Sequence, residues 1–221
     1  MIGMAEIIKK SLSEQIYDVL KEEILNHQIG FGKRLTNREL QERFGVSSTP
    51  VRDAINRLYQ DNLIEEITKV GAKIIDFGLE NAIEINELIG LLCRDAVILS
   101  AKNGDIDEIS ALLEESIINQ ERYIDDDEYL YYDYLFHLLF FDHSNNSKLR
   151  EIYIRYNTLR SILVKCYYSN NTSKAESIIQ HRNILEHYHA GNIKIAADTM
   201  SAHFEHAEIL IKENYDKYFG I

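Results

Sequence analysis

The sequence lacks any run of about 18 apolar residues, the length that a membrane-spanning helix requires. Its first residues do not begin a secretory signal either, because Glu6 interrupts them before an apolar segment develops. There are only two cysteines, Cys93 and Cys166, and they form no CxxC pair. This usage is typical of a reduced protein in which each thiol is a small buried apolar group. These absences predict a cytoplasmic protein with no membrane contact.

Proline is nearly absent, since Pro50 is the only one among 221 residues. Strand-like alternation is also scarce, whereas apolar residues recur with a period of about 3.6 along most of the chain. Because proline interrupts helices, a chain with almost none permits long helices throughout. The sequence therefore predicts a mainly α protein, long enough for two small domains or one large domain.

A surplus of basic charge is missing as well, because the formal net charge is -12. Of the 24 basic and 36 acidic residues, 11 and 12 lie in residues 1–76, which leaves 13 and 24 for the remainder. The N-terminal part therefore has a net charge of −1 and the C-terminal part a net charge of −11. A nearly neutral N-terminal part can still present a basic face to phosphates, so the composition permits DNA binding without demonstrating it.

Signatures of helix starts dominate the first 76 residues. Ser11 with Glu14 and Thr36 with Glu39 have the spacing of capping boxes, in which two side chains satisfy free N–H groups at a helix start. Pro50 suits the first turn of a third helix, where its missing N–H has no helical partner to lose. The predicted elements are helices over about 12–27, 36–45 and from 50 onward, followed by strands at 63–64 and 72–75.

This order of elements predicts a winged helix-turn-helix (α+β) domain over residues 1–76. The N-terminal end of a recognition helix reaches base edges in the major groove, where arginine can bind guanine with two hydrogen bonds. Serine and threonine hydroxyls suit phosphate oxygens, and a glycine at the wing tip permits close approach to the minor groove. For one arginine considered by itself, a solvated surface charge is the simpler interpretation. The predicted DNA-binding residues are Arg38, Ser47, Ser48, Thr49, Arg52 and Gly71.

Residues 80–221 predict a second domain, an all-α bundle of six to seven helices that follows a linker at 77–79. Ser173 with Glu176 has the spacing of another capping box. Short breaks rich in Asn, Asp, Gly and Ser separate the expected helices. These helices are expected over about 80–102, 106–123, 127–142, 147–168, 173–190 and 193–216, with the last two separated from their predecessors by breaks at 169–171 and 191–192.

Histidines and one aspartate in this second part have the spacing of metal ligands. Asp133 and His137 are four residues apart and so project from one face of a helix. Carboxylate and imidazole both suit Zn²⁺, Ni²⁺ and Mn²⁺, and His181 and His203 on two later helices can converge with them in a bundle core. Spacing by itself leaves four competitors, which are His143, His187, His189 and His206.

The N-terminal pattern resembles the winged-helix signature of the GntR family. The resemblance is carried by RLTNREL at residues 34–40 and by FGVSSTPVRDA at 44–54, followed by Leu58 and Leu63. It implies DNA contact at the six residues named above. Ser48 departs from the arginine that the family usually has there, so one cationic contact fewer is expected.

The C-terminal pattern resembles the FCD domain of FadR-type GntR regulators, through DYLFH at residues 133–137 and the segment from Gln180 to Phe204. This resemblance implies that Asp133, His137, His181 and His203 hold a divalent metal, Zn with Ni or Mn as alternatives, whose open positions accept a carboxylate effector. Where the family commonly has an arginine and a glutamate, this chain has Ile89 and Cys93. Arg160 is the candidate replacement for binding the effector, and a plain surface arginine is an equal alternative.

Together these patterns predict a homodimeric transcriptional regulator that is not an enzyme. Its two winged helices are expected to face a pseudo-palindromic DNA operator, and repression follows from the family's usual behaviour. A small organic acid bound in the helical domain must favour one arrangement of the dimer to regulate it. Two alternatives remain: a metal-dependent enzyme that uses the Asp/His site, and a DNA-binding dimer with no effector.

Overall fold

The computed structural model describes residues 10–168 and 171–219, except for the side chains of Lys165, Cys166 and Asn171. The predicted burial of Cys166 and the predicted break at 169–171 therefore lie outside the described residues. The chain divides into two compact units, Met1–Phe77 and Gly78–Ile221. The predicted linker at 77–79 is divided between them, because Phe77 is buried in the first unit and Leu79 begins a helix of the second.

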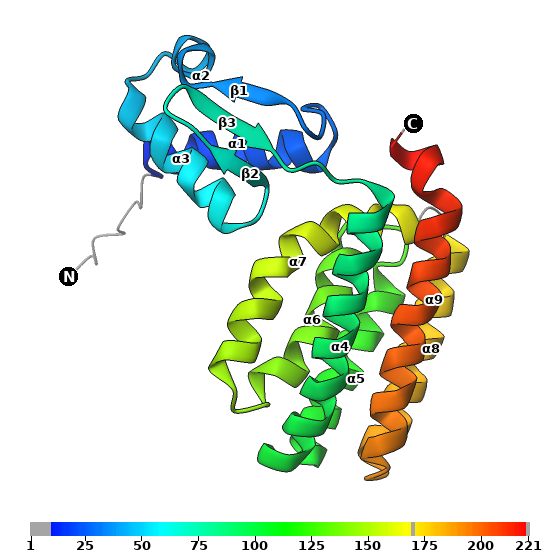
Figure 1. Ribbon diagram of the computed structural model, residues 1–221. Coiled ribbons are helices and arrows are strands. Elements are labelled where there is room, and N and C mark those ends of the chain that lie inside the picture. The colour runs from blue at the N-terminus through cyan, green and yellow to red at the C-terminus, as the bar shows by residue number, and fades with distance from the viewer. Residues whose placement is uncertain (1–9, 169–170, 220–221) are drawn as a thin grey trace, which may run out of the picture. The chain divides into compact units, whose positions relative to one another are not determined.

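Three helices and a small sheet form the N-terminal unit (Figure 1). The sheet is antiparallel, and its central strand pairs on both sides. The elements are α1 (Leu12–Leu25), β1 (Arg34–Thr36), α2 (Asn37–Phe44), α3 (Ser48–Gln60), β2 (Ile64–Ile67) and β3 (Gly71–Ile74), with the strand order β1-β3-β2.

Local signals explain where these elements begin and end. The capping boxes at Ser11 and Thr36 are both formed, and Gly45 ends α2 with a left-handed φ of 64° that favours glycine. The strand β1 was not predicted, because three residues show no alternation. Leu35 in β1 is buried and pairs with Ala72, so this strand exists through its partner rather than through its own sequence.

The placement of Gly71 at the wing tip is wrong. Gly71 is buried as the first residue of β3, and the exposed turn consists of Lys69 and Val70. A Cβ atom on Gly71 would lie 2.0 Å from the carbonyl oxygen of Leu35 in the neighbouring strand. The residue must therefore be glycine so that β1 and β3 can pair closely.

We expect Gly71→Ala to destabilise the N-terminal unit by about 1–3 kcal/mol, because the methyl group must push the two strands apart. Urea unfolding of the full chain, followed by circular dichroism, measures this change. Gly30→Ala is the matched control, since a Cβ atom there meets nothing within 4 Å. Equal stability of the two variants would show that β1 is not held where the structure places it.

Six helices form the C-terminal unit, as predicted for the part of the chain that the structure describes. The capping box predicted at Ser173 is wrong, because Ser173 lies inside a helix that begins at Asn171. The helices are α4 (Leu79–Asn103), α5 (Ile106–Arg122), α6 (Glu128–Asp142), α7 (Ser147–Tyr167), α8 (Asn171–His189) and α9 (Ile193–Phe219).

The helix α6 occupies the interior of this bundle. It is apolar on nearly all sides and contacts α4, α5 and α7, so it carries Asp133 and His137 into the core. The helices α4 and α9 run side by side (Figure 1). Gly90 permits their approach, because a Cβ atom there would lie 2.9 Å from the Cβ atom of Phe204. Among the described residues no helix is both long and apolar enough to span a membrane.

Candidate functional site

The first turn of α3 offers hydrogen-bonding groups that its own helix does not use. Ser47 is the N-cap residue, but its hydroxyl caps no backbone N–H group. Ser48, Thr49 and Arg52 are exposed, whereas Val51 faces the core. Free N–H groups and the positive end of the helix dipole at this turn suit an anion such as phosphate.

A groove of about 430 Å³ lies beside this turn, between the two short helices and the wing. Among the described residues Arg52 forms no ion pair, so its guanidinium is free to bind a ligand. Lys69 adds a second exposed cation from the wing. The polar lining of the groove includes Asn37, Gln41, Ser48, Arg52, Asn56 and Lys69.

The structure brings some predicted DNA-binding residues together and adds others. Ser48 and Arg52 share the groove, while Arg38 on α2 is 88% exposed and paired with Glu42 at 2.8 Å. Asn37, Gln41, Asn56 and Lys69 were missed. Only Lys69 had a sequence signal, because it lies in the predicted turn between two strands; the other three reach the groove through the packing of α2 against α3.

Three imidazoles from three helices meet in the interior of the C-terminal unit. His137 on α6, His181 on α8 and His203 on α9 are all buried. Their ring centroids are 5.1 Å apart for His137–His181, 5.3 Å for His137–His203 and 4.9 Å for His181–His203. One ring nitrogen of each lies within 4.8 Å of the others, a spacing at which one ion can contact all three.

Two glutamines determine which nitrogen of two imidazoles carries the proton. Gln120 donates from Nε2 to the carbonyl oxygen of Tyr132, so its Oε1 accepts from Nδ1 of His181 at 2.8 Å. Oε1 of Gln180 lies 2.7 Å from Nδ1 of His203 and accepts a hydrogen bond from it. With the proton on Nδ1, each Nε2 keeps a lone pair. These glutamines were not predicted, because Gln120 is 61 residues from the histidine it orients.

Several buried nitrogens of the cluster have no protein partner. Both ring nitrogens of His137 and the Nε2 atom of His181 are buried without a hydrogen bond. Such atoms are rare in folded proteins because burial removes their hydrogen bonds to water. Hydrogen bonds within the protein therefore account for one nitrogen of His181 and one of His203, but for neither nitrogen of His137.

Burial keeps the three imidazoles uncharged at neutral pH. It lowers the pKa of His181 to about 4, although the neighbouring Asp133 opposes this change. The pKa of His137 is held well below its usual value by burial and then by Arg160, and that of His203 by burial and then by His181. Neutral imidazoles with free lone pairs are the form that binds a metal ion.

Asp133 lies at the edge of the imidazole cluster and is held by other partners. Arg160 donates to its Oδ2 at 2.7 Å, and the Tyr168 hydroxyl donates to its Oδ1 at 2.8 Å. Nε2 of His181 is 4.0 Å from the same Oδ1. Burial by itself raises the pKa of Asp133, but Arg160, His181 and the two hydrogen bonds hold it below its usual value. The carboxylate is therefore ionised.

Arg160 is 3% exposed, so the alternative of a surface arginine is wrong. It lines a cavity of about 10 Å³ together with Tyr168, Ser177 and His203. A volume of this size holds about one water molecule. The cavity joins the imidazole cluster to the buried guanidinium.

Comparison with known proteins matches each of the two units to a protein family or domain. Residues 12–74 match the family of bacterial regulatory proteins named gntR, and residues 82–206 match the FCD domain. An uncharacterized HTH-type transcriptional regulator of Bacillus subtilis, YdhC, is 30% identical over 199 residues, which are 87% of each chain. The chain belongs to the GntR family. It is a DNA-binding transcriptional regulator with a C-terminal FCD domain.

Solved structures share the fold of this GntR regulator. Escherichia coli McbR/YncC has a TM-score of 0.68 at 24% identity, with 94% of this chain and 100% of that one covered. Lar, which controls the expression of the Listeria monocytogenes agr system, has a TM-score of 0.70 at 21% identity, with 93% and 98% covered.

The first FCD helix of this GntR regulator, α4, has no charged side chain at the two positions that the resemblance singled out. Ile89 and Cys93 are buried, and burial raises the pKa of the Cys93 thiol, so Cys93 is an inert apolar group. Arg94 points to the surface, where it pairs with Asp198 at 3.6 Å. Among the described side chains of this domain, the buried Lys or Arg is Arg160 on α7.

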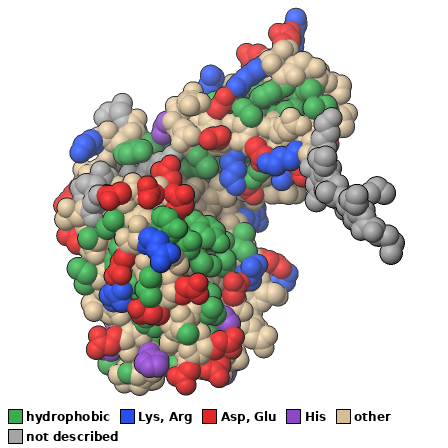
Figure 2. Space-filling view, turned by 180° about the vertical axis from the view of Figure 1, so that it is seen from behind, with side chains coloured by type: hydrophobic (Ala, Val, Ile, Leu, Met, Phe, Trp, Pro, Cys, Tyr) green, Lys and Arg blue, Asp and Glu red, His purple; other side chains and the backbone are tan. Residues whose placement is uncertain are grey.

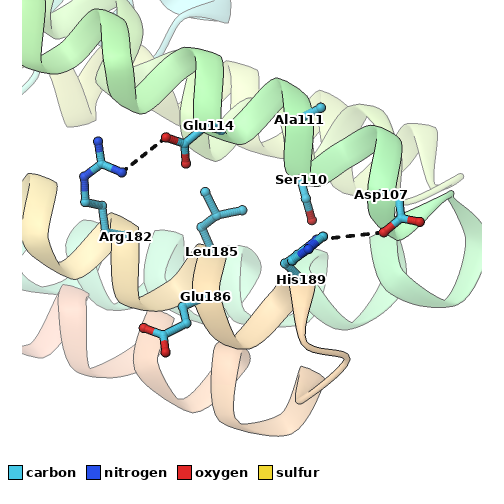
Figure 3. A pocket seen from close by; sticks show the side chains of 8 residues that line it. All are labelled: Asp107, Ser110, Ala111, Glu114, Arg182, Leu185, Glu186 and His189. Atoms are coloured by element: carbon cyan, nitrogen blue, oxygen red, sulfur yellow. Dashed lines mark hydrogen bonds and ion pairs between the residues drawn. The ribbon is translucent and has the colours of Figure 1, made fainter.

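Other charged groups of this GntR regulator lie outside the cluster. A groove of about 550 Å³ between α5 and α8 contains an Arg182–Glu114 pair at 3.3 Å and a His189–Asp107 pair at 3.8 Å (Figure 3). It includes none of the predicted site residues. On the face of the molecule shown in Figure 2, acidic side chains are spread over the larger unit, as the composition indicates.

Proposed function

We propose that this regulator is a repressor whose FCD domain binds one divalent metal ion and a small effector that bears a carboxylate. The observation that supports this function is the convergence of three buried imidazoles whose free nitrogens face one another. The winged helix supplies the DNA contact, and the metal site supplies the response to the effector.

The residues fit a metal ion. His137, His181 and His203 would each give one neutral nitrogen, and Asp133 beside them would give a carboxylate oxygen. In this way one of the partnerless nitrogens of His137 and the partnerless Nε2 of His181 would each bind the ion. Zinc suits this donor set, and nickel or manganese would also bind imidazole and carboxylate. When bound, the ion supplies a positive charge that attracts the effector carboxylate.

Asp133 already accepts two hydrogen bonds, so it would share or exchange one of these partners to become a ligand. Its two oxygens accept from Arg160 and Tyr168, so one of these donors shares or leaves its oxygen when the carboxylate binds metal. Arg160 would then be available to the effector in the adjoining cavity. Gln120 and Gln180 act on the site by holding two imidazoles with Nε2 toward the ion.

DNA recognition is proposed for Arg52, with Ser47, Ser48 and Thr49 as phosphate contacts and Arg38 as a further contact. Gly71 contributes indirectly, because it allows β1 and β3 to pair closely and so sets the position of the wing. Two copies of the chain would place two such surfaces on a pseudo-palindromic operator. An effector changes DNA affinity only if it binds one arrangement of the dimer more tightly than the other.

The test uses the full chain and DNA from the region preceding its own gene. Metal is removed with a chelator, and Zn²⁺, Ni²⁺ or Mn²⁺ is returned before DNA binding is followed by fluorescence anisotropy. We expect about one ion per chain and release of DNA by small organic acids only in the metal-loaded protein. A domain that binds neither metal nor acid would support a dimer with no effector, and turnover of an acid would support the enzyme alternative.

A further inference from the structure

The charges inside the C-terminal unit are balanced without any metal. Asp133 is the only buried carboxylate among the described side chains, and Arg160 is the only buried cation. The two are joined by a hydrogen bond of 2.7 Å. Imidazoles bind a metal ion only in their neutral form, so as ligands they add no charge to the Asp133–Arg160 pair, which is itself balanced.

A divalent ion would therefore leave this interior with two uncompensated positive charges. Buried charge without a counter-charge is strongly unfavourable. Glu176 near the cavity is half exposed, and it faces His206 rather than the cluster. A negatively charged molecule bound beside the ion would supply the compensating charge that no second buried carboxylate of the described residues provides.

The cavity beside the cluster is the candidate position for that molecule. It is lined by His203 of the cluster, by Arg160 and by the hydroxyl-bearing residues Tyr168, Ser173 and Ser177. The Tyr168 hydroxyl already donates to Asp133, so the guanidinium is the group best able to donate to an anion. The Nε atom of Arg160 is buried without a hydrogen-bond partner. An anionic group there would satisfy this donor, while a second one on the same molecule would reach the ion.

We propose that the effector is a small dianion, with one anionic group at the metal ion and the other on Arg160. The inference rests on the proposed metal site. A short dicarboxylate and inorganic phosphate share this chemistry and are the two sources to distinguish. Because the cavity has room for about one water molecule, we expect short ligands to need the least rearrangement.

The experiment compares matched ligands on the zinc-loaded full chain by isothermal titration calorimetry at pH 8. Malonate and succinate are each compared with their monoamides, which have the same size but one negative charge fewer; phosphate and sulfate form a separate arm. We expect the better diacid, or phosphate, to bind at least about tenfold more tightly than any monoanion, since a charge-assisted contact is lost in the monoamide. The comparison of the dicarboxylates with phosphate and sulfate shows which of the two kinds of dianion the site prefers.

Arg160→Gln should remove most of this preference, with the affinities compared on protein whose zinc content is measured in parallel. Arg160→Lys keeps the charge and should keep the preference, which separates charge compensation from a purely structural role. Equal affinities for diacid and monoamide in the zinc-loaded protein would overturn the inference but leave the metal site standing. Binding of none of the dianions would also overturn it, and failure to take up any metal would overturn both.

Discussion

Replacing Arg52 by alanine is expected to weaken binding to the specific operator by about 10- to 100-fold, while binding to unrelated DNA changes much less. The guanidinium is exposed on the first turns of α3, forms no ion pair among the described residues and faces the groove beside the wing. A bidentate contact to a base is worth about 1–3 kcal/mol, which corresponds to this loss. Anisotropy titrations with operator and scrambled duplexes at one fixed salt concentration measure it.

The matched control is Arg155→Ala, which removes the same charge from an exposed position on α7. It should leave operator affinity within about twofold. Its only expected effect on DNA binding is the long-range effect of one lost positive charge, which physiological salt screens. The circular dichroism spectrum and unfolding temperature of the Arg52 variant should match those of the wild type, since Arg52 is exposed. Unchanged discrimination between operator and scrambled DNA would remove α3 as the recognition helix.

The N-terminal unit could be predicted largely from local signals. Capping at Ser11 and Thr36 and the glycine end of α2 depend on residues within one turn of each other, so the sequence contains them directly. Two features could not be found this way. The strand β1 depends on a partner about 37 residues further along the chain, and the need for glycine at position 71 arises from the carbonyl of Leu35.

The helices of the C-terminal unit were also predictable, because each is bounded by short polar breaks. The imidazole cluster could be predicted only in part. A spacing of four puts Asp133 and His137 on one helix face, but choosing His181 and His203 among the other histidines required the family resemblance. Gln120 could not be assigned, and Arg160 could be named only as a candidate beside the equal alternative of a surface arginine, since each meets the cluster only through the packing of separate helices. The composition of a buried cluster depends on tertiary contacts that spacing does not encode.

His137→Leu is expected to have opposite effects on metal binding and on stability. The imidazole is fully buried, with both nitrogens unpartnered in the absence of a ligand, and each such atom costs about 1–3 kcal/mol. Leucine is similar in size and has no polar atom to satisfy. We therefore expect the metal-free variant to be more stable than metal-free wild type by about 1–3 kcal/mol, which raises the unfolding temperature by several degrees.

The same variant should bind zinc at least about 100-fold more weakly, since loss of a ligand exceeds the 10- to 100-fold loss seen for outer-shell partners. Competition with a chromophoric chelator measures the affinity, and thermal unfolding with and without zinc measures both effects. His189→Leu is the control, because that side chain is 64% exposed and outside the cluster. Wild-type zinc affinity would remove His137 from the ligand set. A less stable metal-free variant would mean that these nitrogens are already satisfied without an ion, and the strongest support for a metal site would be lost.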